Sequence, residues 1–342
     1  MINPYLHIMR NITVFAVLVI IFFGAQPVFG EQSYGISWRP LLGIVYGQVD
    51  EIVYPIDTHA PLLSLLTWEM KPVWYYGISM DFSRTKPMEQ GGFFALFALQ
   101  NGISGQSGIL ENRDWMSSEN SNLTHYSMHN NHTRELFFLD IALGLSLPLQ
   151  DFLLLKTFIS ASFMRFSFFG TDGQGIYARR SCECLPYDTC THSLYHHIND
   201  DPTRVSFEGN IISYTQEWLY GAPGISLSFQ GGFFAAELSF LASPLIYCVA
   251  LDEHKEHRYR HFSTQFRDFM LGGLVIEPGL KLSFTAFTWL DFSFDVSWRH
   301  ISGTKGITYQ MSPIGTGTYI QGGEAGAGVS FFKISLGLRV SR

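Results

Sequence analysis

The feature that most constrains the fold is an alternation of apolar and polar residues with a period of two. One face of the segment 332–340 carries four apolar residues, Ile334, Leu336, Leu338 and Val340. The other face carries Lys333, Ser335, Gly337 and Arg339. Segment 291–298 alternates in the same way. Extended strands place successive side chains on opposite faces, so these segments predict a sheet with one polar and one apolar side.

Residues 1–30 predict an export signal. A short polar region containing Arg10 precedes an apolar run over 12–23, and small residues lead to Gly30. The apolar run is shorter than the ~20 residues of a spanning helix. No charged cluster follows it that would retain an uncleaved anchor. We therefore expect a signal peptide over 1–30 and a mature domain over 31–342.

Composition favours a membrane barrel over a soluble sandwich. No later apolar run is long enough for a spanning helix, yet aromatic residues make up 15% of the chain and glycine occurs 32 times. Aromatic residues at membrane interfaces and glycines at strand bends are typical of β-barrels. A soluble sandwich would also alternate, but it would hide its apolar face against a second sheet. The net charge of −7 and the lack of a basic run argue against nucleic-acid binding.

Turn signals alternate between short and long. Short polar breaks lie near 85–91, 148–151, 230–232 and 287–288. Long polar stretches lie near 47–60, 101–133, 171–210, 249–262 and 302–323. Bacterial barrels have short periplasmic turns and longer outer loops. The sequence thus predicts an all-β, transmembrane antiparallel β-barrel of about ten strands with long extracellular loops, and no second domain.

Two polar stretches follow strand-like segments and place carboxylates at loop entrances. Asp252 and His254 are two residues apart, so an extended chain puts them side by side with Glu253 facing away. A carboxylate beside an imidazole orients the ring and raises its basicity. The second stretch runs over 111–116 and contains Asp114. Taken alone, the first stretch is more typical of a solvated loop with a chance Asp-x-His pattern.

Together these stretches resemble the omptins, the outer-membrane β-barrel proteases. Asp252-Glu253-His254 matches one family motif in full, and the segment 112–116 matches a second motif except at its leading residue, Asn112. Weaker matches follow in the same order along the chain, at 51–54, 63–68, 165–168 and 326–328. The resemblance implies a ten-stranded barrel in the bacterial outer membrane, with an extracellular cleft that cleaves surface peptides or proteins and needs no metal or cofactor.

The resemblance also implies catalytic roles. His254 would be the general base, Asp252 would orient it, and Asp114 would help to hold the attacking water from the opposite wall. We expect room for one water between Asp114 and His254. Asn112 departs from the family, which has a carboxylate there; an amide can bond the water but cannot take its proton. Either the rate is lowered, or proteolysis is lost.

Substrate-binding residues are only partly kept. Omptins hold a basic side chain before the cut bond with two acids, of which the first matches Glu51 and the second corresponds to Ala250. A two-sided clamp is therefore expected to be missing. His129 matches a histidine near the family's cleft, and the acidic residue that precedes it in the family corresponds to His125.

Outer-membrane lipid is the remaining partner that the resemblance implies. Omptins grip lipopolysaccharide with basic residues on the barrel exterior, and Arg165 matches one of them. A second position corresponds to Glu217, which cannot hold a phosphate. We therefore expect contact with outer-membrane lipid at Arg165, by headgroup binding or by snorkelling, without a strict lipid requirement.

Four cysteines lie outside the family pattern. Cys182, Cys184 and Cys190 crowd the third long loop near His192, His196 and His197, and Cys248 lies at the edge of the catalytic loop. Zinc binding is one interpretation. Export favours disulfides instead. A bridge from Cys248 to the third loop would tie that loop over the cleft, but the sequence does not fix the pairing.

Three functions remain open from the sequence. The first is an omptin-like endopeptidase that cleaves near basic residues. The second is a catalytically impaired barrel that serves as a surface adhesin or receptor, and the third is a porin-like channel. A small barrel with many ionisable inward residues argues against the channel.

Overall fold

The fold is taken from a computed structural model of the chain. The structure describes residues 34–55, 62–84, 89, 91–116, 122–182, 193–195, 198–199, 201–255, 263–287, 289–311 and 319–340. Residues 35–342 form one compact unit, and the account below concerns that unit. The predicted signal peptide and its cleavage site lie outside the described residues.

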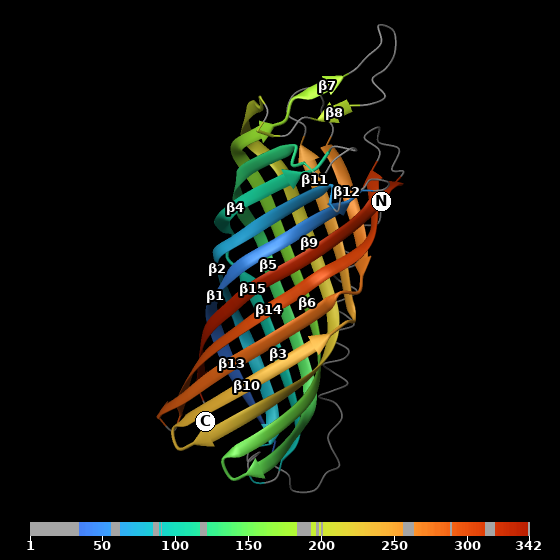
Figure 1. Cartoon of the computed structure of the whole chain (residues 1–342). Coiled ribbons are helices and arrows are strands. Elements are labelled where there is room, and N and C mark those ends of the chain that lie inside the picture. Colours follow the sequence, from blue (N-terminus) through green and yellow to red (C-terminus); the bar gives the residue numbers. More distant parts are fainter. Residues whose placement is uncertain are drawn as a thin grey trace. The chain divides into compact units, whose positions relative to one another are not determined.

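The strands close into an antiparallel ring (Figure 1). In chain order they are β1 (Tyr34–Tyr54), β2 (Ser64–Arg84), β3 (Gly92–Gly102), β4 (Gly105–Asp114), β5 (His125–Gln150), β6 (Leu153–Tyr177), β9 (Thr203–Gly231), β10 (Phe234–Ser243), β11 (Ile246–Lys255), β12 (Ser263–Leu271), β13 (Leu274–Phe287), β14 (Leu290–Met311) and β15 (Tyr319–Val340). A separate hairpin pairs β7 (Arg180–Cys182) with β8 (Ser193–Tyr195). Closure comes from the pairing of β1 with β15.

Three walls of the ring consist of two consecutive strands each. β2 and β5 both pair with β3 and with β4, β9 pairs with β10 and β11, and β14 pairs with β12 and β13. Around the ring the walls are therefore β1, β2, β3/β4, β5, β6, β9, β10/β11, β12/β13, β14 and β15. These ten walls confirm the predicted architecture.

Successive strands of the ring end alternately at its two ends. Strands β2, β5, β9 and β13 finish at one end, and strands β1, β4, β6, β11 and β14 finish at the other, which we call the looped end (Figure 1). The predicted order of turns and loops is confirmed, except that the connection over 85–91 is as long as those over 256–262 and 312–318. No helix among the described residues is long and apolar enough to cross a bilayer.

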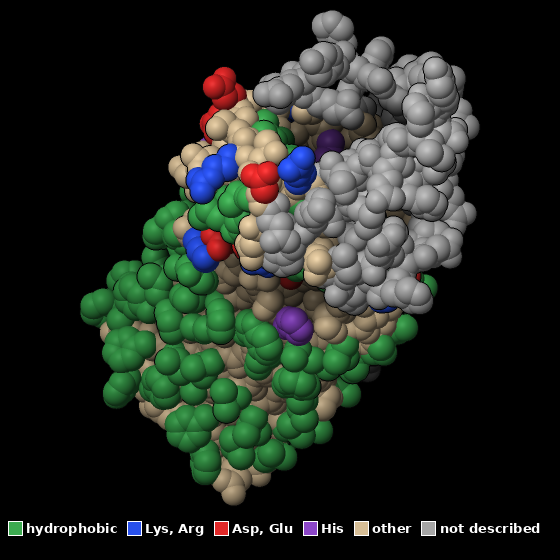
Figure 2. All heavy atoms as spheres, turned by 45° about the horizontal axis from the view of Figure 1, so that its top comes forward, with side chains coloured by type: hydrophobic (Ala, Val, Ile, Leu, Met, Phe, Trp, Pro, Cys, Tyr) green, Lys and Arg blue, Asp and Glu red, His purple; other side chains and the backbone are tan. Residues whose placement is uncertain are grey.

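The outer surface carries an apolar band. Figure 2 shows hydrophobic side chains over the lower flank of the molecule and charged side chains above them. Exposed members include Trp38, Leu145, Ile159, Phe240 and Leu336. On β1, β2, β9 and β11 the exposed large apolar side chains nearest the looped end are Tyr46, Trp74, Leu219 and Leu251. Leu336 points out while Ser335 is buried, as the alternation predicted.

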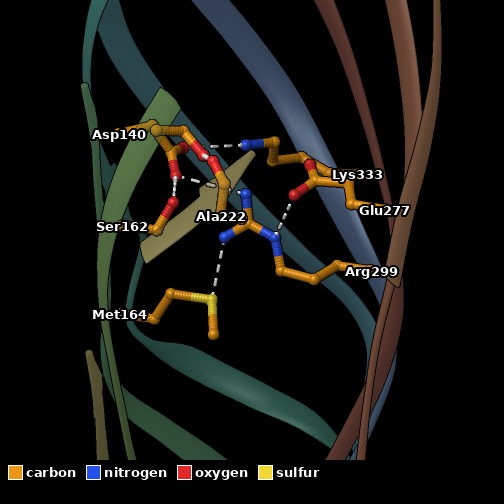
Figure 3. A network of polar contacts seen from close by, with 8 residues as sticks. Asp140, Ser162, Met164, Ala222, Glu277, Arg299 and Lys333 are labelled. Atoms are coloured by element: carbon orange, nitrogen blue, oxygen red, sulfur yellow. Dashed lines mark hydrogen bonds and ion pairs between the residues drawn. The ribbon is translucent and has the colours of Figure 1, made fainter. Parts of the chain in front are cut away.

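A polar network crosses the lower interior (Figure 3). Arg299 on β14 lies 2.7 Å from Glu277 through Nε, 3.2 Å from Asp140 through Nη2 and 2.9 Å from the Met164 sulfur through Nη1. Lys333 lies 3.5 Å from Asp140. The wall β14 lies opposite β5 in the ring, which carries Asp140. The network therefore ties opposite sides of the barrel together.

An aromatic layer fills the interior between this network and the looped end. Trp68 on β2 stacks on Tyr214 of β9 at 5.6 Å and on Phe168 of β6 at 5.7 Å. Gln216 on β9 donates a 2.8 Å hydrogen bond to the carbonyl oxygen of Asp50 on β1, the opposite wall. This layer forms a floor beneath the mouth of the barrel.

Candidate active site

The first wall of the site is β11, which carries an acid–imidazole pair. His254 Nε2 lies 2.5 Å from Asp252 Oδ2. The Asp252 side chain is 2% exposed, whereas that of His254 is 45% exposed. Phe266 on β12 meets the imidazole edge to face at 5.8 Å between ring centroids. A buried carboxylate thus holds an imidazole that remains accessible, as the spacing of two residues predicted.

The second wall is the end of β4 beside the start of β2. Asp114 accepts a 2.6 Å hydrogen bond from Ser64 Oγ and a 3.2 Å bond from the Asn112 amide. Ser64 also donates to the Asn112 oxygen at 3.3 Å. Burial raises the pKa of Asp114, although these two bonds and the charges of His125 and His254 oppose the rise. The Asn112 amide therefore donates a hydrogen bond to the Asp114 carboxylate, although it supplies no carboxylate of its own.

The two walls face each other across the mouth. β5, β6 and β9 separate β4 from β11 in the ring. Nevertheless the charge of His254 acts on the pKa of Asp114. His125 lies directly opposite Asp114 on β5, and burial lowers the pKa of its imidazole. The fold thus brings Asp114, Asn112, Asp252 and His254 to one region; a one-water gap between Asp114 and His254 stays a prediction.

Glu51 belongs to a buried carboxyl cluster that the sequence did not reveal. Its pKa is raised well above the usual range, first by burial and then by the charges of Asp252 and Asp268. Asp268 lies on β12 directly opposite Ala250 on β11. Burial also raises the pKa of Asp268 to about 6. No motif marks Asp268, because its position depends on how β11 and β12 pair.

The other two predicted contact residues have structural partners. His129 is buried, its Nδ1 lies 2.7 Å from the carbonyl oxygen of Asp172, and its Nε2 lies 3.0 Å from Ser127 Oγ. Arg165 lies 3.0 Å from Glu135 and 2.8 Å from Glu217. The Arg165 guanidinium, which was expected to contact lipid, thus forms ion pairs with the carboxylates of Glu135 and Glu217. The substrate role of His129 and the lipid role of Arg165 stay predictions.

A bridge from Cys248 to the third long loop, one of the pairings that the sequence left open, does not form. Cys248 is a free thiol, fully buried inside the barrel, where it lies opposite Trp218 on β9 and Met270 on β12. The inward face of β11 therefore directs its sulfur into the core. Cys184, Cys190 and the nearby histidines lie outside the described residues, as does the side chain of Cys182.

A closed barrel with an apolar outer band defines a protein of the outer-membrane β-barrel class. Residues 32–341 match the model of the Omptin family. The chain belongs to the omptin family and to the bacterial outer membrane. Peptides or proteins at that membrane are the substrates that the family implies.

One of the solved structures that match the chain shares its fold. The outer membrane protease OmpT from Escherichia coli is 18% identical, with a TM-score of 0.76 over 92% of this chain and 99% of that chain. The translocator domain of the autotransporter NalP from Neisseria meningitidis is 9% identical, with a TM-score of 0.32 over 98% of each chain. Comparison with curated protein sequences finds no match.

Proposed function

We propose that this protein is an omptin-type endopeptidase in which His254 activates a water for attack on the scissile carbonyl. The observation that carries the proposal is the 2.5 Å contact between a buried Asp252 carboxylate and an accessible His254 imidazole, set opposite Asp114. Asp252 orients the ring and stabilises the imidazolium that forms when the water gives up its proton. The imidazolium then protonates the leaving amine.

Asp114 and Asn112 act from the facing wall. The carboxylate of Asp114 accepts a hydrogen bond from the water and aligns it, while the Asn112 amide and the Ser64 hydroxyl fix the carboxylate. Asn112 supplies no negative charge, so the water is held by one acid fewer than in the family pattern. A slower enzyme with the same geometry is the expected result.

The interior supports this function over a channel. The network around Arg299 and the aromatic layer around Trp68 both join walls across the lumen. A small barrel is readily filled by its own side chains. The alternative of a binding-only barrel rests on Asn112 alone.

Cleavage of a peptide panel by refolded protein tests the proposal. Fluorogenic hexapeptides that carry Arg, Lys, norleucine or Glu before the cut bond would be assayed with wild type, His254→Ala and His132→Ala. His132 stacks on Phe169 at 4.9 Å and bonds Thr171, so its replacement controls for the loss of any histidine. Loss of a general base lowers the rate ~100- to 10,000-fold.

The outcomes separate the candidate functions. Cleavage by wild type and His132→Ala, but not by His254→Ala, supports the endopeptidase. Equal background from all three proteins contradicts it and favours the binding role. Ion conductance of wild type in planar bilayers would favour the channel.

A further inference from the structure

The lower interior of the barrel encloses two adjoining cavities. One has a volume of about 250 Å³ and reaches the end of the barrel opposite the looped end, where Gln230 and Gly232 of the β9–β10 turn line it. The other has a volume of about 280 Å³ and is bounded by Asp140 and Arg299 of the polar network in Figure 3. Both are lined by the same five charged side chains, Arg39, Asp81, Lys156, Glu237 and Lys281. The two cavities thus form one polar space, which we call the lower chamber.

Lys281 lines both cavities without an acceptor for its ammonium group. Among the described residues it takes part in no hydrogen bond or ion pair. Its direct partner in the β10–β13 register is Glu237. The Glu237 carboxylate already accepts a 2.6 Å bond from Lys156 and 2.9 Å bonds from Ser226 and Ser228. The acid that the sheet places beside Lys281 is therefore bound to other donors.

Asp81 and Gln100 are acceptors in the same chamber that lack a donor. Asp81 on β2 forms no hydrogen bond or ion pair with any described residue. Gln100 on β3 is 4% exposed, lines the second cavity, and has a buried Oε1 without a hydrogen-bond partner. Polar groups in protein interiors nearly always have a partner. One cation, one carboxylate and one amide oxygen therefore remain available to a ligand in the chamber.

Lys281 and Asp81 lie near each other but do not pair. The charges of Arg39, Asp295, Glu237 and Asp81 all act on Lys281. Arg39 is buried, and among the described residues it pairs only with Asp295, at 3.9 Å. That distance is too long for a hydrogen bond, so the guanidinium keeps donors available beside Lys281. The chamber thus combines donors from two cations with the acceptors of one free carboxylate.

The charges of the chamber balance only for a ligand that carries both signs. Its other charged side chains form neutral pairs, Lys156 with Glu237, Arg39 with Asp295 and Arg339 with Asp291. The Arg299 network likewise holds two cations and two acids. An anion alone would leave Asp81 without a counter-charge, and a cation alone would leave Lys281 without one. Since one water needs roughly 10–15 Å³, each cavity admits a molecule of several non-hydrogen atoms.

We propose that the lower chamber is a binding site for a small zwitterion of the α-amino acid type. Lys281 and Arg39 bind its carboxylate, and Asp81 binds its ammonium group. The ligand enters from the end of the barrel where the β9–β10 turn lines the chamber. This site is independent of the proposed endopeptidase, because the Arg299 network and the aromatic layer around Trp68 separate it from the mouth.

Equilibrium dialysis of refolded protein in detergent micelles tests the inference. Radiolabelled glycine, acetate and methylammonium present a zwitterion, its anionic half and its cationic half. They would be dialysed against wild type, Lys281→Met, Asp81→Asn and Lys71→Met. Lys71 is paired with Glu69 and half exposed, so its replacement controls for the loss of any lysine. We expect wild type and Lys71→Met to bind glycine at least tenfold more tightly than either half, because two charge-assisted contacts form instead of one.

The two chamber variants should each reverse this preference. Asp81→Asn leaves a lone cation, so it should bind acetate more tightly than glycine. Lys281→Met leaves a lone carboxylate, so it should bind methylammonium more tightly than glycine. These reversals, with glycine binding at least tenfold weaker in both variants, support the inference and show that the variants are folded.

The wild-type measurement decides the matter even if a variant fails to refold. No saturable binding of glycine by wild type overturns the inference. Acetate or methylammonium bound as tightly as glycine also overturns it, in favour of a site for a simple ion. A preference for glycine that survives in both folded variants would mean that Lys281 and Asp81 do not hold the ligand, and it too overturns the inference.

Discussion

At the residue scale, the proposed mechanism gives Asn112 the task of fixing the Asp114 carboxylate. It donates to Asp114 at 3.2 Å and accepts from Ser64 at 3.3 Å, so it is part of the hydrogen-bond set that fixes the acid. An aspartate at this position would add a negative charge beside the water and a second proton acceptor.

We expect Asn112→Asp to raise kcat/KM on the Arg hexapeptide by about tenfold or more. The second carboxylate would draw the water toward His254 and stabilise the imidazolium across the mouth. Asn112→Ser, which also lacks charge, serves as the control. A rate for Asn112→Asp no higher than that of Asn112→Ser would contradict the expectation.

The burial of the Asp268 carboxyl group has a measurable effect on the stability of the fold. Its pKa is about 6 in the folded protein, against an ordinary 3.8, because of burial and the nearby Asp252. Glu51, Cys248 and Tyr214 also face this cluster, and none of them is a cation. A raised folded pKa stabilises the fold below pH ~4, and that contribution is lost as pH rises through ~6.

Asp268→Asn should therefore be more stable than wild type at pH 8, by up to about 3 kcal/mol for a shift of roughly two pKa units. At pH 3.5 the two proteins should unfold alike. Urea titrations followed by tryptophan fluorescence at both pH values check this. A gain of equal size at pH 3.5 and pH 8 would count against it.

At the scale of elements, two glycines allow the backbone turn that separates β12 from β13. Gly272 and Gly273 interrupt the wall with φ values of +86° and +101°. At Gly273 an added Cβ would lie 2.5 Å from the carbonyl oxygen of Ser302 on β14. Only glycine fits this combination without strain.

We expect Gly273→Ala to lower the free energy of unfolding by about 1–3 kcal/mol, because it forces a strained backbone and a close contact. Gly105→Ala is the control, since an added Cβ there meets nothing within 4 Å. Urea unfolding of both variants measures the difference. Equal midpoints for Gly273→Ala and Gly105→Ala would disprove the role of the glycine pair.

The sequence predicted these elements better than it predicted their contacts. Period-two alternation and turn residues identified the walls and both ends, because they depend on local order along the chain. Asp268 escaped notice because its place opposite Ala250 depends on the register between β11 and β12. The state of Cys248 escaped prediction for a related reason: its place near a loop entrance was clear, but not that its side chain faces the core as a free thiol.

On the scale of the whole molecule, the Arg299 network places buried side chains across the interior of the barrel. Its guanidinium is 3% exposed and serves Glu277 and Asp140 on different walls. Removing one partner of a buried ion pair leaves uncompensated charge and costs about 3–5 kcal/mol.

Arg299→Ala should accordingly lose about 3–5 kcal/mol of unfolding free energy and admit ions that wild type excludes. Lys71→Ala, which breaks an exposed pair with Glu69, should lose no more than about 1 kcal/mol. Urea unfolding and planar-bilayer conductance test the two effects. A stable, non-conducting Arg299→Ala barrel would show that other residues close the lumen.

The crosswise position of this network bears on how the barrel is assembled. Arg299 belongs to the penultimate wall and Asp140 to the fourth, so they meet only when nearly the whole chain is in place. Until then, an incomplete ring carries several charges with no counterpart. Partly assembled forms are thereby disfavoured, because the ion pairs that stabilise the native state form only when the ring is nearly closed.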